Sequence, residues 1–105
     1  MAAGHEVSVE RDGDKVRLVL TGEIDLSAAP DVAVHAEQAL VGNPATVVVD
    51  LSGATFLDSS GIGALVVLTN SAESRPTTLH LKPGPPNVMR VLDLVGLTDT
   101  FQLVD

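Results

Sequence analysis

The sequence predicts a single α/β domain over residues 1–105, in which a mixed β-sheet combines an N-terminal antiparallel hairpin with parallel strands. Its 105 residues are enough for one hydrophobic core and too few for two domains joined by a linker. Hydrophobic residues make up 45% of the chain and charged residues 19%, so the chain is expected to fold. Strand-like and helix-like segments alternate along it, which is typical of parallel strands joined by right-handed crossovers.

An N-terminal hairpin is the first predicted element. Apolar residues alternate with polar ones over residues 7–9 and again over residues 16–20, which is the period of a half-buried strand. Asp12-Gly13-Asp14 lies between the two runs and is a turn signal, because glycine accepts a positive φ. The segment Gly22–Asp25 interrupts the alternation, so we expect the second strand to end there.

A helix is expected over residues 28–41. Ser27, together with Asp25, is a candidate N-cap, and Gly42 suits the position just past the end of the helix. Apolar residues recur inside this segment at helical spacing. The predicted buried face consists of Val32, Ala36, Ala39 and Leu40.

A strand and a second helix are expected to follow. The β-branched, apolar run over residues 46–51 predicts a strand covered on both faces or deep in a parallel sheet. A loop is expected over residues 52–57, and a helix over residues 62–71. The predicted apolar stripe of this helix is Ile62, Leu65, Val66 and Thr69.

The last part of the chain predicts one more strand and one more helix. The strand covers residues 78–81, and after a proline-rich turn the helix begins at Pro86 and ends at Gly96. Its predicted apolar stripe is Val88, Val91, Leu92 and Val95. Residues 101–104 are expected to return as a short edge strand or helical tail. The predicted order of strands and helices is therefore ββαβαβα.

Composition excludes several classes of function. Six basic and 14 acidic residues leave a formal charge of −8, which disfavours binding to nucleic acids or anionic membranes. The absence of cysteine excludes disulfides, thiolate catalysis, zinc fingers and iron–sulfur clusters. No apolar run approaches the ~20 residues of a membrane span, and the N-terminus has no signal-peptide pattern. We therefore expect no membrane insertion and a cytoplasmic location.

Known catalytic and cofactor-binding patterns do not match this sequence. The histidines lie near the terminus, on a helix and in a strand, without the spacing of metal ligands; they are His5, His35 and His80. Gly61-Ile62-Gly63 begins like a dinucleotide fingerprint, but Val66 stands where the third glycine is needed. Ser60 lacks the flanking small residue of a hydrolase elbow. We predict no catalytic residue, metal or cofactor.

Asp50 allows an alternative interpretation, because receiver domains carry their phosphate-accepting aspartate at the end of a buried strand. Such a site needs further acidic ligands and a lysine. Glu23 and Asp25 belong to the segment entering a helix, and the only lysines are Lys15 and Lys82. We therefore favour the structural interpretation, in which Asp50 accepts hydrogen bonds from loop amides.

The most distinctive segment is residues 55–64, Thr-Phe-Leu-Asp-Ser-Ser-Gly-Ile-Gly-Ala. Asp58 and Ser59 are both good caps. Capping does not explain two glycines in the first turn, which together cost about 1–2 kcal/mol relative to alanine. Gly61, Gly63 and Ala64 would leave the helix start almost without side chains, so another chain could approach its backbone closely.

A serine at this helix start is a candidate phosphorylation site. Free amides and the helix dipole stabilise added negative charge there. A phosphate adds about −1.5 to −2 charges and three acceptor oxygens. Beside Asp58, it would oppose a docked partner by bulk and by charge repulsion. The predicted result is a switch that spoils an interface without unfolding the domain.

Four blocks of the sequence resemble the anti-sigma factor antagonists of the STAS superfamily. They are Leu20–Asp25, Val49–Ser52, Phe56–Gly63 and Val91–Leu97. The resemblance implies a sheet with helices mainly on one face. It also implies partner switching: the unphosphorylated antagonist binds an anti-sigma factor that is a serine kinase, and thereby frees a sigma factor for transcription. The kinase inactivates the antagonist by phosphorylating the serine after the aspartate, and a metal-dependent serine phosphatase restores it.

Carried over by position, the resemblance makes Ser59 the phosphoacceptor, with Ser60 as the second hydroxyl and Asp25 near the same surface. The expected partner-binding residues are Asp25, Asp58, Ser59, Ser60, Gly61 and Gly63. We expect a monomer when the protein is free. One alternative is an accessory subunit of a membrane transporter or a sensory scaffold. Another is an enzyme or nucleotide-binding protein that uses the loop of Asp58 and Ser59.

Overall fold

A computed structural model describes residues 4–105 of the chain. Within these residues, the elements are β1 (His5–Asp12), β2 (Lys15–Ile24), α1 (Ala29–Leu40), β3 (Thr46–Leu57), α2 (Ser59–Glu73), β4 (Thr78–Lys82), α3 (Pro86–Leu94), the 3₁₀ helix η1 (Leu97–Thr100) and β5 (Gln102–Leu103). The predicted order ββαβαβα is confirmed, followed by η1 and β5. None of the helices in this part of the chain is long and apolar enough to cross a membrane.

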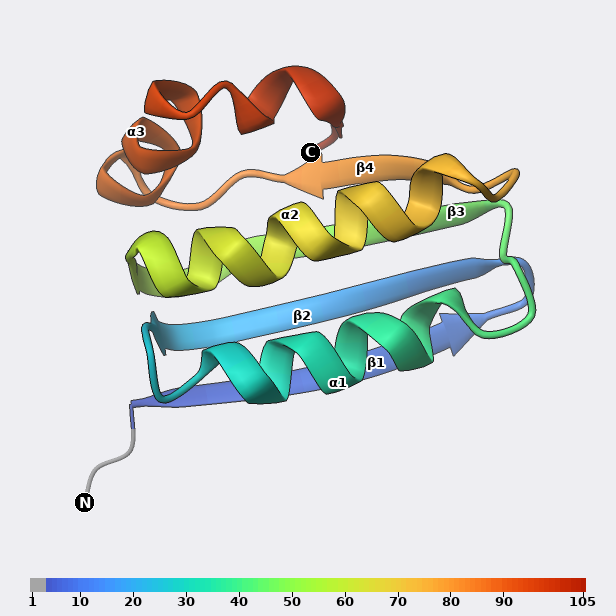
Figure 1. Cartoon of the computed structure of the whole chain (residues 1–105), viewed down its shortest axis with the longest axis horizontal. Helices are drawn as coiled ribbons and strands as arrows, with labels where there is room; N and C mark the ends of the chain where they lie inside the picture. The colour runs from blue at the N-terminus through green and yellow to red at the C-terminus, as the bar shows by residue number, and fades with distance from the viewer. Residues whose placement is uncertain (1–3) are drawn as a thin grey trace.

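The strands form one five-stranded sheet in the order β1-β2-β3-β4-β5. β1 and β2 pair antiparallel as the predicted hairpin, and every other neighbouring pair is parallel. Because the parallel strands follow one another in chain order, right-handed crossovers place their helices on the same face. Figure 1 shows α1 and α2 side by side over that face, with α3 beyond β4. The predicted α/β fold with a mixed sheet is confirmed.

The hydrophobic core lies between the sheet and the helices. Alternate side chains of β2 and β3 point into it; Val16, Leu18, Leu20, Val47, Val49 and Leu51 are all 0% exposed. The four residues predicted for α1 are its buried apolar face. In α2, Ile62, Leu65 and Thr69 are buried as predicted, while Val66 is only half-buried and Leu68 is buried in the stripe instead. The helical period therefore predicted the faces of both helices closely.

The loop predicted over residues 52–57 is wrong, because β3 continues through it to Leu57. The break predicted at Gly22–Asp25 is also wrong, since β2 continues to Ile24. The two extensions pair with each other in parallel, with register shifts between Val19 and Thr21 and between Gly22 and Glu23. Bulges of this kind disturb the alternation of side chains without ending the ladder. The pairing partner therefore extends both strands beyond the sequence pattern.

The C-terminal segment differs in detail from the prediction. Pro86 begins α3 as predicted, but the helix ends at Leu94, two residues before Gly96, which has φ +74° and precedes η1. Val88 and Leu92 are buried, but Val95 is 56% exposed because it lies past the last helical residue. The chain then forms η1, which was not predicted, and β5 is the expected short edge strand.

Candidate functional site

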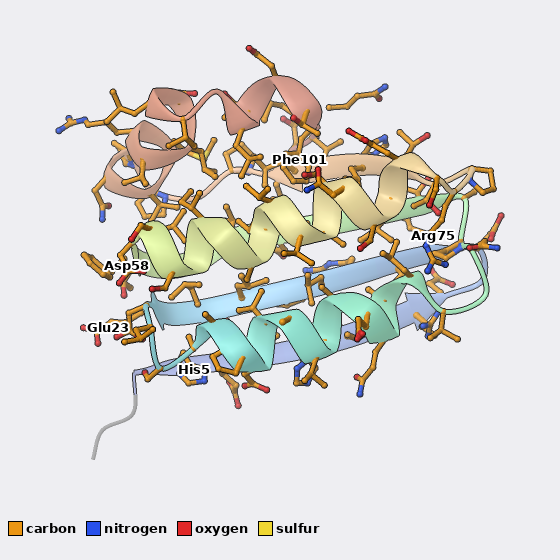
Figure 2. The ribbon with its side chains drawn as sticks, in the orientation of Figure 1. His5, Glu23, Asp58, Arg75 and Phe101 are labelled. Carbon is orange, nitrogen blue, oxygen red and sulfur yellow. The ribbon has the colours of Figure 1, made fainter. Side chains whose placement is uncertain are left out.

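The candidate site lies where β2 and β3 end and α2 begins. The Asp58 amide donates a hydrogen bond to the Ile24 carbonyl at 3.3 Å, which joins the ends of the two strands. Figure 2 shows Glu23 and Asp58 at the same end of the molecule. The parallel pairing therefore brings together two sequence blocks that lie far apart in the chain.

Asp58 is the N-cap of α2, as predicted. Its backbone is extended, and its Oδ1 accepts hydrogen bonds from the amides of Ser60 at 2.9 Å and Gly61 at 3.2 Å. These amides have no partner inside the helix. The Asp58 carboxylate thus occupies the helix N-terminus, the place that would otherwise attract a further anion.

The hydroxyl-bearing residues begin the helix itself. Ser59 is the first residue of α2 and is exposed, whereas Ser60 is half-buried. Because the cap is directly before it, Ser59 lies at the outermost turn of the helix. An exposed hydroxyl at a helix start is accessible to an approaching protein.

The two glycines of this turn have different surroundings. A Cβ atom at position 61 would lie 2.6 Å from the Ile24 carbonyl oxygen and 2.7 Å from Leu57 Cδ1, so only glycine fits there. A Cβ at position 63 would meet nothing within 4 Å. Gly61 and Ala64 are buried inside the domain, which corrects the expectation that they leave the helix start bare. Only Gly63 is exposed.

Asp25 organises the loop that enters α1. Its Oδ1 accepts hydrogen bonds from the Ser27 amide at 3.1 Å, the Ser27 hydroxyl at 2.8 Å and the Ala28 amide at 3.3 Å. The Ser27 hydroxyl and these amides together outweigh desolvation and lower the pKa of the Asp25 carboxyl. Ser27 is not an N-cap, because α1 begins after Ala28, which makes no side-chain cap bond.

Asp50 does not lie at the end of a strand, because β3 extends well beyond it. Its side chain accepts hydrogen bonds from the Ser52 amide at 2.9 Å, the Ser52 hydroxyl at 2.6 Å and Arg17. Burial raises the pKa of this carboxyl, but the bonds from Ser52 and Arg17 and the charge of Lys82 lower it by more. A receiver-type phosphoacceptor would lie at a strand end, and Asp50 does not. The expected loop amides are also wrong, because the amide that donates to Asp50 belongs to Ser52, which lies within β3.

Two of the histidines contact the same carboxylate, that of Asp31, which the sequence did not indicate. His5 Nε2 lies 3.3 Å from Asp31 Oδ2, and His35 Nδ1 lies 3.1 Å from Asp31 Oδ1. Only the i,i+4 spacing of Asp31 and His35 could have been read from the sequence. Residues 4–105 contain no group of three or more potential ligands arranged to hold a metal ion.

Two exposed apolar side chains near the site were also missed. Leu26, in the loop after β2, is 74% exposed, and Phe56, near the end of β3, is 46% exposed. An apolar residue in a polar loop was the available signal for Leu26. For Phe56 the sequence offered no equivalent signal, because the face to which its side chain points depends on the pairing of β3 with β2.

The model of one protein family, described as "Mlab, STAS domain", matches residues 7–105. The chain belongs to the STAS domain family. An anti-sigma-B factor antagonist of Listeria monocytogenes is 30% identical over 94 residues, which cover 90% of this chain and 82% of that protein. The family assigned from the sequence blocks is therefore confirmed.

Two solved structures have a similar fold. An anti-sigma factor antagonist from Mycobacterium paratuberculosis matches with a TM-score of 0.79 and 26% identity, covering 94% of this chain and 84% of that chain. A sulfate transporter family protein from Wolinella succinogenes matches with a TM-score of 0.75 and 16% identity, covering 88% of this chain and 77% of that chain. At that identity the second likeness shows the fold alone.

Proposed function

We propose that this STAS domain is an anti-sigma factor antagonist. Its unphosphorylated form binds an anti-sigma factor that is also a serine kinase, and this binding frees a sigma factor for transcription. The observation that carries the proposal is the exposed hydroxyl of Ser59 directly after the capping Asp58, at a surface where two sequence blocks meet. The similarity to antagonists of Listeria and Mycobacterium supports it.

Phosphorylation of Ser59 abolishes binding in this proposal. The kinase transfers a phosphoryl group from ATP to Ser59 Oγ, with release of ADP and the hydroxyl proton. Asp58 already accepts hydrogen bonds from the amides of Ser60 and Gly61, so in this proposal the new phosphate projects toward the partner. There it meets the nucleotide phosphates that a kinase holds opposite its acceptor. Bulk and repulsion then separate the two proteins, and a metal-dependent serine phosphatase restores the active form.

The partner-binding surface includes acidic, hydroxyl and glycine positions. We assign to it Asp25, Asp58, Ser59, Ser60 and Gly63, with Gly61 holding the first turn of α2 against β2. Ser59 is a substrate of the partner, and the domain itself is not an enzyme in this proposal. Because sigma factors act in transcription, the protein works in the cytoplasm, and we propose that it is a monomer when free.

Intact-mass spectrometry tests this proposal. The protein, Ser59→Ala and Ser60→Ala are each incubated with ATP and with each candidate anti-sigma kinase from the source genome. We expect one added phosphate on the wild type and Ser60→Ala, and none on Ser59→Ala. A phosphate that persists in Ser59→Ala would assign the acceptor elsewhere.

The alternative is an accessory subunit of a membrane transporter or a sensory scaffold. The fold shared with the Wolinella sulfate transporter family protein supports this alternative. Absence of phosphate from every kinase, together with co-purification of an ATPase subunit or a sensor protein, would favour this alternative. A nucleotide-binding function predicts heat of binding in calorimetry with millimolar nucleotide.

A further inference from the structure

Two large apolar side chains are exposed close in sequence to the strand ends that meet at the Ser59 turn. Leu26 follows β2 and is 74% exposed, and Phe56 precedes Ser59 in β3 and is 46% exposed. Each leaves apolar surface in contact with water that burial against a partner would remove, with a gain of roughly 25 cal/mol per Å². Both belong to the segments joined by the hydrogen bond from the Asp58 amide to the Ile24 carbonyl.

The register of β2 and β3 determines which way Phe56 points. Ile24 pairs with Leu57 and both are buried in the core, at 0% and 3% exposure. Glu23 pairs with Phe56, and neighbouring residues of a strand point to opposite faces. Glu23 and Phe56 therefore point to the sheet face opposite α1 and α2. Phe56 on this face and Ser59 at the start of α2 are separated by only two residues, Leu57 and Asp58.

This surface is acidic. Glu23 and Asp58 lie at the same end of the molecule (Figure 2), and Asp25 is in the loop after β2. The carboxyl of Asp25 has a lowered pKa, so it is ionised at neutral pH. Residues 20–30 and 53–63, which build the surface, include no lysine or arginine. Within these two segments, the apolar side chains of Leu26 and Phe56 are thus accompanied by acidic residues and by no lysine or arginine.

We propose that Leu26 and Phe56 are the apolar anchors by which this domain docks on its anti-sigma partner, and that the partner meets them with apolar pockets flanked by lysine or arginine. This inference rests on the proposed function and names the chemistry of its partner. Interfaces draw most of their affinity from a few large side chains that fill pockets, and opposite charges around them speed association. The basic groups pair with Glu23 and Asp25, which leaves Ser59 opposite the nucleotide of the kinase.

Binding of each candidate anti-sigma kinase to immobilised wild type, Ser59→Asp, Leu26→Ala, Phe56→Ala and Leu103→Ala tests the inference. Leu103 is the matched control, because it is 60% exposed on β5. We expect Leu26→Ala and Phe56→Ala each to raise the Kd at least ~tenfold, and Leu103→Ala to leave it within about twofold. The association rate should fall as salt rises, and Glu23→Gln should reduce that dependence. Circular dichroism and thermal unfolding verify that each variant is folded.

The outcomes separate the two proposals. In one outcome the kinase binds wild type and does not bind Ser59→Asp, but binds Leu26→Ala and Phe56→Ala as tightly as wild type. Leu26 and Phe56 are then not anchors, while the proposed phosphorylation switch at Ser59 is retained. If the association rate does not depend on salt, the proposal that the partner carries lysine or arginine around its pockets is wrong. Equal weakening by Leu103→Ala also overturns the assigned surface. If no candidate kinase binds wild type, the proposed function and this inference both fail.

Discussion

Gly61 packs directly against the carbonyl oxygen of Ile24, at a distance that leaves no room for a side chain. A Cβ at position 61 would lie 2.6 Å from that oxygen. This contact joins the first turn of α2 to the end of β2 and so fixes Ser59 relative to the loop of Asp25. The sequence suggested that Gly61 leaves the helix start open to a partner. In the structure, Gly61 is instead required by packing inside the domain.

Gly61→Ala should therefore destabilise the domain, because either α2 or the end of β2 must move. We expect a loss of about 1–3 kcal/mol in the free energy of unfolding, measured by urea denaturation. Gly63→Ala is the matched control. Its Cβ meets nothing, and alanine is favoured in a helix, so we expect a gain of about 0.5–1 kcal/mol. Equal stability of the two variants would contradict the packing argument.

Removing the cap of α2 should also weaken the fold. Asp58→Ala leaves the amides of Ser60 and Gly61 without their acceptor, and we expect a loss of about 0.5–2 kcal/mol in thermal or urea unfolding. Asp58→Asn keeps a side-chain oxygen that accepts the same bonds, so it should retain most of the stability. A loss in Asp58→Asn as large as in Asp58→Ala would mean that charge, and not the hydrogen bonds, is responsible.

Asp50→Asn should lower stability at neutral pH on the order of 1–3 kcal/mol, because Asp50 is 3% exposed and is hydrogen-bonded to Ser52 and Arg17. The pKa of Asp50 is lowered in the folded state. Its stabilising contribution is therefore present above the pKa of the unfolded chain and lost as pH falls through the folded value.

Urea unfolding of wild type and Asp50→Asn across acidic pH measures this contribution. The difference in stability between them should shrink as pH falls below the range of an ordinary aspartate. Asp99→Asn, at an exposed position in η1, should change stability by less than about 0.5 kcal/mol. If the difference in the free energy of unfolding between wild type and Asp50→Asn stays constant with pH, the ionisation of Asp50 does not contribute to it.

Substitution of Ser59 should leave the fold intact. Its side chain is exposed at the start of α2, so Ser59→Ala and Ser59→Asp should each unfold within about 0.5 kcal/mol of wild type. Backbone amide spectra should change only around the Ser59 turn. Loss of several kcal/mol in Ser59→Asp would contradict a switch that acts on the interface, because the charge would then act by unfolding.

The sequence pattern predicted most of the elements and failed where the strands end. The buried faces of α1 and most of α2 follow from helical spacing. Ser52 and Gly53 interrupt the apolar run of β3, so the segment after them resembles a loop. In the structure, β2 supplies hydrogen-bond partners out to Leu57, and the register shifts absorb the break. No local pattern contains that information, because the partner strand lies elsewhere in the chain.

The amino-acid sequence by itself determined the fold class, the capping role of Asp58 and the position of Ser59 at a helix start, because these depend on residues near one another in the chain. Tertiary structure decided the rest. It placed Asp50 in the middle of a strand, buried Gly61 against Ile24 and exposed Phe56 on the open side of the sheet. Each of these depends on the register between β2 and β3, which is set by contacts between distant residues.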